Sequence, residues 1–106
     1  MKLYKIHTLI RGDMATNSNN IKSIVKAGTV IDMLALSEQP MALAEMARQT
    51  GMVKSTLHGI VSTLVDIGYV KQMPETGRYT LGMKLFEIGY SISRKLDERR
   101  IAYPYM

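Results

Sequence analysis

The sequence contains no cysteine among its 106 residues. This absence excludes disulfide bonds, zinc sites built on thiolates and catalysis by a thiol, and it agrees with a reducing compartment. Runs of apolar residues are far shorter than the ~20 that a membrane-spanning helix needs, so we expect no membrane partner. The chain opens with no charged-then-apolar leader, and we therefore expect a protein that is not secreted.

Signatures of catalysis are lacking as well. The sequence has no paired carboxylates, nucleophile elbow, phosphate-binding loop or metal-ligand spacing. His58 stands without acids or cysteines at the spacing of a metal site. We therefore predict that the chain is not an enzyme and holds no cofactor and no metal.

The charge balance is basic, with 14 Lys and Arg against 9 Asp and Glu and a net charge of +5. A basic domain favours polyanions, nucleic acid above all. Most of the excess lies toward the two ends, since residues 21–80 carry six basic side chains against five acidic ones. Charge alone is thus weak evidence for DNA, and the case depends on how the chain is organised.

The length predicts one folded domain, preceded by an extension. Residues 1–13 alternate weakly in the manner of a strand, and residues 14–20 are small and polar. We predict that residues 1–20 form a flexible arm and linker, of which limited proteolysis should remove residues 1–13 early.

The spacing of the apolar residues predicts three helices, at 21–37, 44–50 and 54–67. The first should turn Thr29 and its charged residues toward solvent. Its predicted core stripe consists of Ile24, Ala27, Gly28, Ile31, Leu34 and Ala35.

Glycines mark the ends of the second and third helices, at Gly51 and Gly68. The third helix should bury Leu57, Ile60, Val61 and Leu64 and leave Ser55, Gly59, Ser62 and Asp66 on the opposite side. Two short strands, 69–73 and 78–81, are joined by the turn residues 74–77.

Helix, short helix, tight turn, second helix and hairpin, in this order, predict a winged helix-turn-helix at residues 21–82. The fold class is mainly α with a small β-hairpin wing. Helix 54–67 would enter the major groove of DNA, and the wing, 69–81, would lie on the flanking groove. The predicted DNA contacts are Lys54, Ser55, Thr56, His58, Ser62, Arg78 and Lys26. We expect Arg78 at the tip of the hairpin, where the alternative is a salt bridge with Glu75.

A last helix, 82–100, carries an apolar stripe that continues beyond the predicted domain. We assign residues 83–106 to a linker or dimerisation helix and a tail. The stripe, Leu85, Ile88, Ile92 and Leu96, either packs on the winged domain or contacts a partner helix. We favour the partner, and thus a homodimer or higher oligomer.

Several segments resemble the DNA-binding domain of the IclR family of transcriptional regulators. They are Lys-Ser-Thr-Leu-His (54–58), Thr-Leu-Val-Asp-Ile-Gly-Tyr-Val (63–70) and Pro-Glu-Thr-Gly-Arg-Tyr-Thr-Leu-Gly (74–82). Ser23-Ile-Val-Lys-Ala27 and Ala44-Glu-Met-Ala47 are similar to the first two helices of that family. The resemblance covers about residues 21–96.

The resemblance implies a bacterial, cytoplasmic and nucleoid-associated regulator, often a repressor, that binds double-stranded operator DNA as a dimer or higher oligomer. Chains of the family usually continue through a linker helix into a larger effector-binding domain. We therefore expect the small-molecule effector site to be absent from this chain.

Three positions depart from the family pattern. Gly59 stands where Arg usually follows the His of the recognition helix, which removes a DNA contact and places a poor helix former in the helix. Ala42 stands where Ser or Thr usually caps the short helix, three residues before Glu45. Val53 replaces a common Pro.

One rival function remains open on these residues. Winged helices also serve as protein–protein docking or dimerisation modules without binding DNA. Gly59 and the nearly neutral segment 21–80 favour this alternative slightly.

Overall fold

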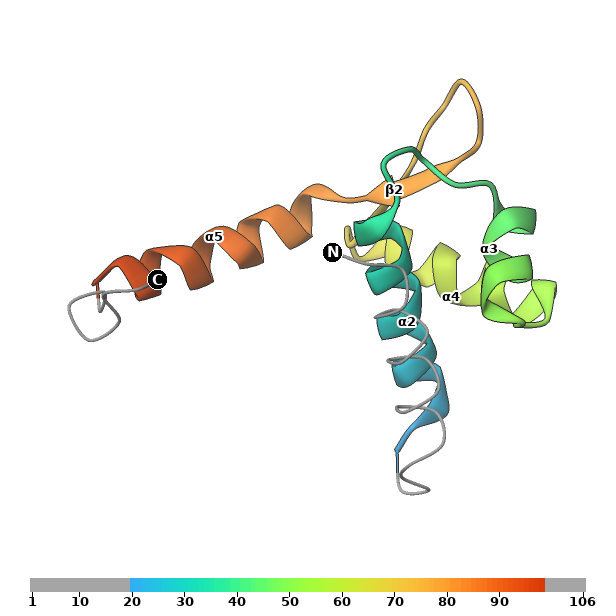
Figure 1. Ribbon diagram of the computed structural model, residues 1–106, viewed down its shortest axis with the longest axis horizontal. Helices are drawn as coiled ribbons and strands as arrows, with labels where there is room; N and C mark the ends of the chain where they lie inside the picture. Colours follow the sequence, from blue (N-terminus) through green and yellow to red (C-terminus); the bar gives the residue numbers. More distant parts are fainter. Residues whose placement is uncertain (1–19, 99–106) are drawn as a thin grey trace.

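A computed structural model describes residues 20–98 of the chain (Figure 1). Within these residues three helices precede one hairpin and a fourth helix follows it. The helices are α2 (Lys22–Leu36), α3 (Leu43–Thr50), α4 (Lys54–Asp66) and α5 (Met83–Glu98), and the strands are β1 (Val70–Gln72) and β2 (Tyr79–Leu81). This arrangement confirms the predicted mainly α fold with a hairpin wing. Residues 1–19 of the predicted arm and linker lie outside the described residues.

The core gathers side chains from α2, α3, α4 and both strands. Its buried members are Val30, Met33, Leu34, Met41, Met46, Leu57, Val61, Leu64, Val70 and Tyr79. Leu57 and Val61 are completely buried, as the helical spacing predicts, whereas Ile60 is half-buried at the edge. Burial of such apolar surface is the main force that holds the small domain together.

The predicted core side of α2 is wrong in part. Ile24 is 69% exposed, and Gly28 and Ala35 are exposed as well. Thr29, expected to face solvent, is buried and donates its hydroxyl proton to the Val25 carbonyl oxygen at 3.1 Å. The helix is apolar on several sides, so its own periodicity does not select the one that packs. Contacts with both α4 and β2 select it.

The connection between α2 and α3 joins the hairpin through a backbone bridge. The Met41 N–H donates to the Tyr79 carbonyl at 2.9 Å, and the Tyr79 N–H donates back to the Met41 carbonyl at 2.8 Å. β1 and β2 pair antiparallel, with Lys71 opposite Thr80. The bridge therefore fixes the first residue of β2, at the turn end of the paired strands, against the segment that leads into α3.

α5 leaves the body of the domain. Figure 1 shows it projecting away from α2, α3 and α4. Among its described residues none is buried. No helix in the described part of the chain combines the length and the apolar character that crossing a bilayer requires.

Candidate nucleic-acid interface

α3, a tight turn and α4 form the helix-turn-helix. The turn is made at Gly51, whose φ of +75° is a left-handed conformation that other residues rarely adopt. α4 buries Leu57, Val61 and Leu64, and this fixes which of its sides is free. The side away from the core carries Ser55, Gly59 and Asp66, all exposed as the sequence predicts. Ser62, predicted to be free on the same side, is half-buried because it faces the hairpin.

The first turn of α4 presents polar groups to solvent. Lys54, Ser55 and Thr56 are all exposed. Val53 precedes the helix and makes no side-chain hydrogen bond to it. The side chain of Val53 therefore caps none of the backbone N–H groups of this turn. Together with the helix dipole, these groups favour an anion such as phosphate.

His58 and Ser62 lie on the hairpin side of α4. Together with Gln72 and Tyr79 they line a recess of about 270 Å³ between the helix and the wing. His58 is exposed and Ser62 is half-buried. The structure thus brings these two predicted residues together with the wing, where a groove edge could reach both elements.

Arg78 lies at the turn end of the hairpin, as predicted, but with an unexpected partner. It directly precedes β2, between the turn and the Gln72–Tyr79 pair, and its Nη1 lies 3.8 Å from Oε1 of Glu45 in α3. The expected alternative partner, Glu75, is therefore wrong. Glu45 was missed as a partner because α3 and the hairpin meet only after folding, through the Met41–Tyr79 bridge.

Lys26 lies apart from these residues, on α2. It is half-buried and sits one turn before Val30. The structure therefore spreads the predicted contacts over three elements: α4, the turn end of the hairpin and α2.

The described part of the chain covers the predicted stripe of α5 only in part. Leu85 and Leu96 are half-buried, while Ile88 and Ile92 are 37% and 56% exposed. A second apolar group, not foreseen from the sequence, lies beside it. Met83, Phe86 and Tyr90 are exposed, and the rings of the last two stack at 6.4 Å.

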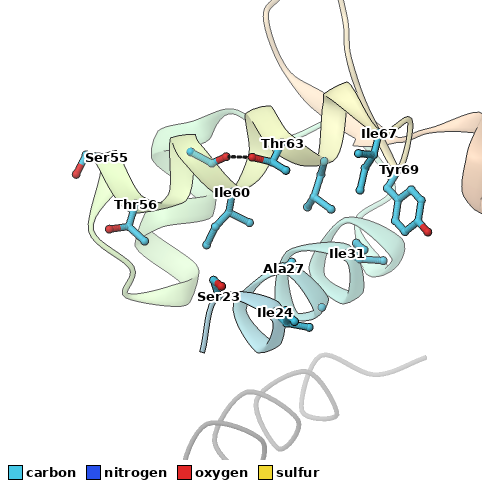
Figure 2. Close-up of a pocket in the computed structure, with 13 residues that line it drawn as sticks. Ser23, Ile24, Ala27, Ile31, Ser55, Thr56, Ile60, Thr63, Ile67 and Tyr69 are labelled. Atoms are coloured by element: carbon cyan, nitrogen blue, oxygen red, sulfur yellow. Dashed lines mark hydrogen bonds between the residues drawn. The ribbon is translucent and has the colours of Figure 1, made fainter. Parts of the chain in front are cut away.

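A groove of about 680 Å³ runs between α2 and α4 (Figure 2). Ile24, Ala27 and Ile31 line it from α2, and Thr56 and Ile60 line it from α4 (Figure 2). None of the described residues that line it carries a charge. The groove borders the start of α4, so the recognition helix has an apolar side as well as a polar one.

Comparisons with known proteins agree with this geometry. Residues 23–74 match the model of the IclR helix-turn-helix domain. The chain is 35% identical over 82 residues to the HTH-type transcriptional regulator XynR of Escherichia coli, which covers 77% of this chain and 32% of that protein. It is 27% identical over 92 residues to the transcriptional repressor IclR of the same organism, covering 87% and 34%.

A solved structure supports the same conclusion. The IclR family transcriptional regulator from Brucella abortus superposes with a TM-score of 0.70 at 26% identity, over 83% of this chain and 34% of that one. The chain thus spans about a third of the length of the relatives that it matches. With its helix-turn-helix, its wing and these matches, the chain belongs to the IclR family of transcriptional regulators and carries that family's non-enzymatic DNA-binding domain.

Proposed function

We propose that this chain recognises operator DNA by placing α4 in the major groove, first turn foremost, with the wing on the flanking groove. One observation carries the proposal: Lys54, Ser55 and Thr56 are exposed at a helix start whose opposite side is anchored in the core. A major groove of ~12 Å admits such a helix.

The predicted contacts divide by chemistry. Lys54 and Arg78 would bind phosphates as cations, and Lys26 would add a third contact from α2. Ser55 and Thr56 are small and polar, which allows close approach to the edges of the bases. His58 and Ser62 would act from the side of α4 that faces the wing.

The finer description of the protein is part of the same proposal. The winged domain is residues 21–82, the arm is residues 1–20, and residues 83–106 form a linker helix through which two copies associate. The chain would act as a repressor in a bacterial cytoplasm, as the resemblance implies, with its effector site outside these residues. The relative named a repressor supports this direction of control.

Selection from random duplexes tests the proposal. The 106-residue chain should enrich a palindromic sequence, with half-sites ~34 Å apart if two copies bind. Affinity should fall steeply between ~50 and ~200 mM salt, because phosphate contacts release counterions. Failure to enrich any sequence, together with a flat salt dependence, would reject DNA reading by this domain.

Lys54→Ala tests the placement of α4. The variant should weaken binding to all duplexes and reduce the salt slope by about one phosphate contact. Lys95→Ala in α5 removes the same charge at an exposed position away from α4 and should leave the slope unchanged. Equal effects of the two substitutions would assign the loss to net charge alone.

The α2–α4 groove favours a second candidate function. Its uncharged lining suits an apolar protein segment better than a phosphate backbone. As a docking module the chain would bind no duplex at any salt concentration, so the salt series above separates the two functions.

A further inference from the structure

Glu45 occupies a position that usually caps its own helix. It is the third residue of α3, where a glutamate can accept a hydrogen bond from the N–H of the capping residue. The other half of that arrangement needs a Ser or Thr hydroxyl, and Ala42 offers none; no side-chain hydrogen bond caps α3. The Glu45 carboxylate instead faces the wing, 3.8 Å from the Arg78 guanidinium.

The backbone holds these two residues together. Tyr79 pairs with Met41 through two hydrogen bonds of 2.8 and 2.9 Å, and this brings Arg78 beside the first turn of α3. The Arg78 N–H also donates to the Thr76 hydroxyl at 3.2 Å, which orders the approach to β2. Because the backbone is held in this way, Arg78 changes between a paired and an unpaired state mainly by rotation of its side chain.

Both side chains remain within reach of an incoming ligand. The side chain of Arg78 is 48% exposed and that of Glu45 is 38% exposed. In helix-turn-helix proteins the first helix of the motif crosses the DNA backbone, so the start of α3 lies where phosphates pass. A carboxylate at this position repels phosphates and also pairs with the Arg78 guanidinium, which would otherwise bind them.

We propose that Glu45 competes with DNA phosphates for Arg78 and thereby lowers the affinity of the wing for any duplex. The inference rests on the proposed function. In the free domain Arg78 pairs with Glu45, and in the complex Arg78 turns to a phosphate. An exposed pair of this kind is weak, so the competition sets the affinity without preventing binding.

The test is a double-mutant cycle in the whole chain. The variants are Glu45→Gln, Arg78→Gln and the double variant, and their affinities for a random-sequence duplex are measured by fluorescence anisotropy between ~50 and ~200 mM salt. Glu45→Gln should raise affinity roughly two- to fivefold and leave the salt slope nearly unchanged, because Arg78 contacts a phosphate in both complexes. Most of the gain in affinity should be lost when Arg78 is already Gln.

Glu75→Gln is the matched control. It makes the same change of charge at an exposed position in the hairpin turn, while Arg78 pairs with Glu45. Its effect should be smaller than that of Glu45→Gln and independent of Arg78. Equal effects of the two substitutions, additive effects of Glu45→Gln and Arg78→Gln, or weaker binding by Glu45→Gln would each overturn the inference.

A measurement without DNA separates this inference from the proposed function. The heteronuclear NOE of the Arg78 Nε–Hε group, recorded on the free chain, should fall in Glu45→Gln and stay unchanged in Glu75→Gln. An unchanged NOE in both variants would refute the pairing, whatever the DNA result. Loss of the NOE in a chain that binds no duplex would refute the proposed function and leave the ion pair established.

Discussion

Gly59 lies in the middle of α4 on the side away from the core. No heavy atom of the described chain, apart from the helix's own backbone and the adjoining residues, lies within 4 Å of where a Cβ would sit. Glycine in a helix interior costs about 1 kcal/mol relative to alanine. The position can therefore hold a larger side chain, and glycine there makes the helix less stable than alanine would.

We expect Gly59→Ala to raise the free energy of unfolding by about 1 kcal/mol, measured by urea denaturation. Gly59→Arg should also strengthen DNA binding and steepen its salt dependence, because it adds a cation beside Ser55 and Ser62. A weaker complex with Gly59→Arg would indicate that this side of α4 does not face the duplex.

Ala42 offers a second test at the residue scale. It precedes α3 with extended backbone (φ −76°, ψ 152°) and no side-chain cap. Ala42→Ser should stabilise the chain by about 0.5–2 kcal/mol and leave DNA affinity unchanged, as thermal unfolding and anisotropy would record. Ala44→Ser, inside the same helix, is the control and should bring no gain. A lower melting temperature for Ala42→Ser would contradict the placement of the cap.

Single residues with a local cause could be predicted from the sequence. Gly51 and Gly68 end or follow their helices with φ of +75° and +89°, and Ala42 occupies the capping position that the spacing to Glu45 indicates. The partner of Arg78 could not be predicted, because Glu45 is distant in sequence and only the backbone bridge brings it near.

At the scale of elements, the junction between the hairpin and α5 is tightly packed. A Cβ added to Gly82 would collide with the carbonyl oxygen of Gly68, and the backbone there cannot move without disturbing the turn after α4. The Gly82 N–H also donates to the Tyr69 carbonyl at 2.9 Å. Gly82 therefore ties the end of the wing to the end of α4.

We expect Gly82→Ala to destabilise the chain by about 1–3 kcal/mol, because backbone atoms must shift to admit the methyl group. Gly28→Ala is the control: a Cβ there has no neighbour within 4 Å, and helix propensity should make that variant more stable. Denaturation curves that move in the same direction for both variants would exclude the close approach as the cause.

At the scale of the whole molecule, packing against the winged body does not account for the apolar residues of α5. It exposes Ile92 by 56% and Phe86 by 67%, and none of its described residues is buried. Exposed apolar stripes of this kind mark interaction sites. The helix is therefore the part of the chain best suited to hold two copies together.

We expect Ile92→Asp to shift the chain from dimer to monomer in sedimentation velocity, while the unfolding of the winged body changes little. Ser91→Asp adds the same charge on the hydrophilic side of α5 and should leave association intact. A monomeric parent chain, or dissociation caused equally by Ser91→Asp, would contradict association through this stripe.

The sequence by itself determined the element order, the hairpin, the glycine-ended helices and the family, because each depends on local propensity or on residues close together in the chain. It also determined which side of α4 is polar, since only one side of that helix is apolar enough to bury. Tertiary structure alone decided which side of α2 packs, that Glu45 meets Arg78, and that the described part of the chain leaves most of α5 uncovered. Those outcomes depend on contacts between segments far apart in sequence, where α2 is apolar on several sides and the backbone bridge selects the neighbours.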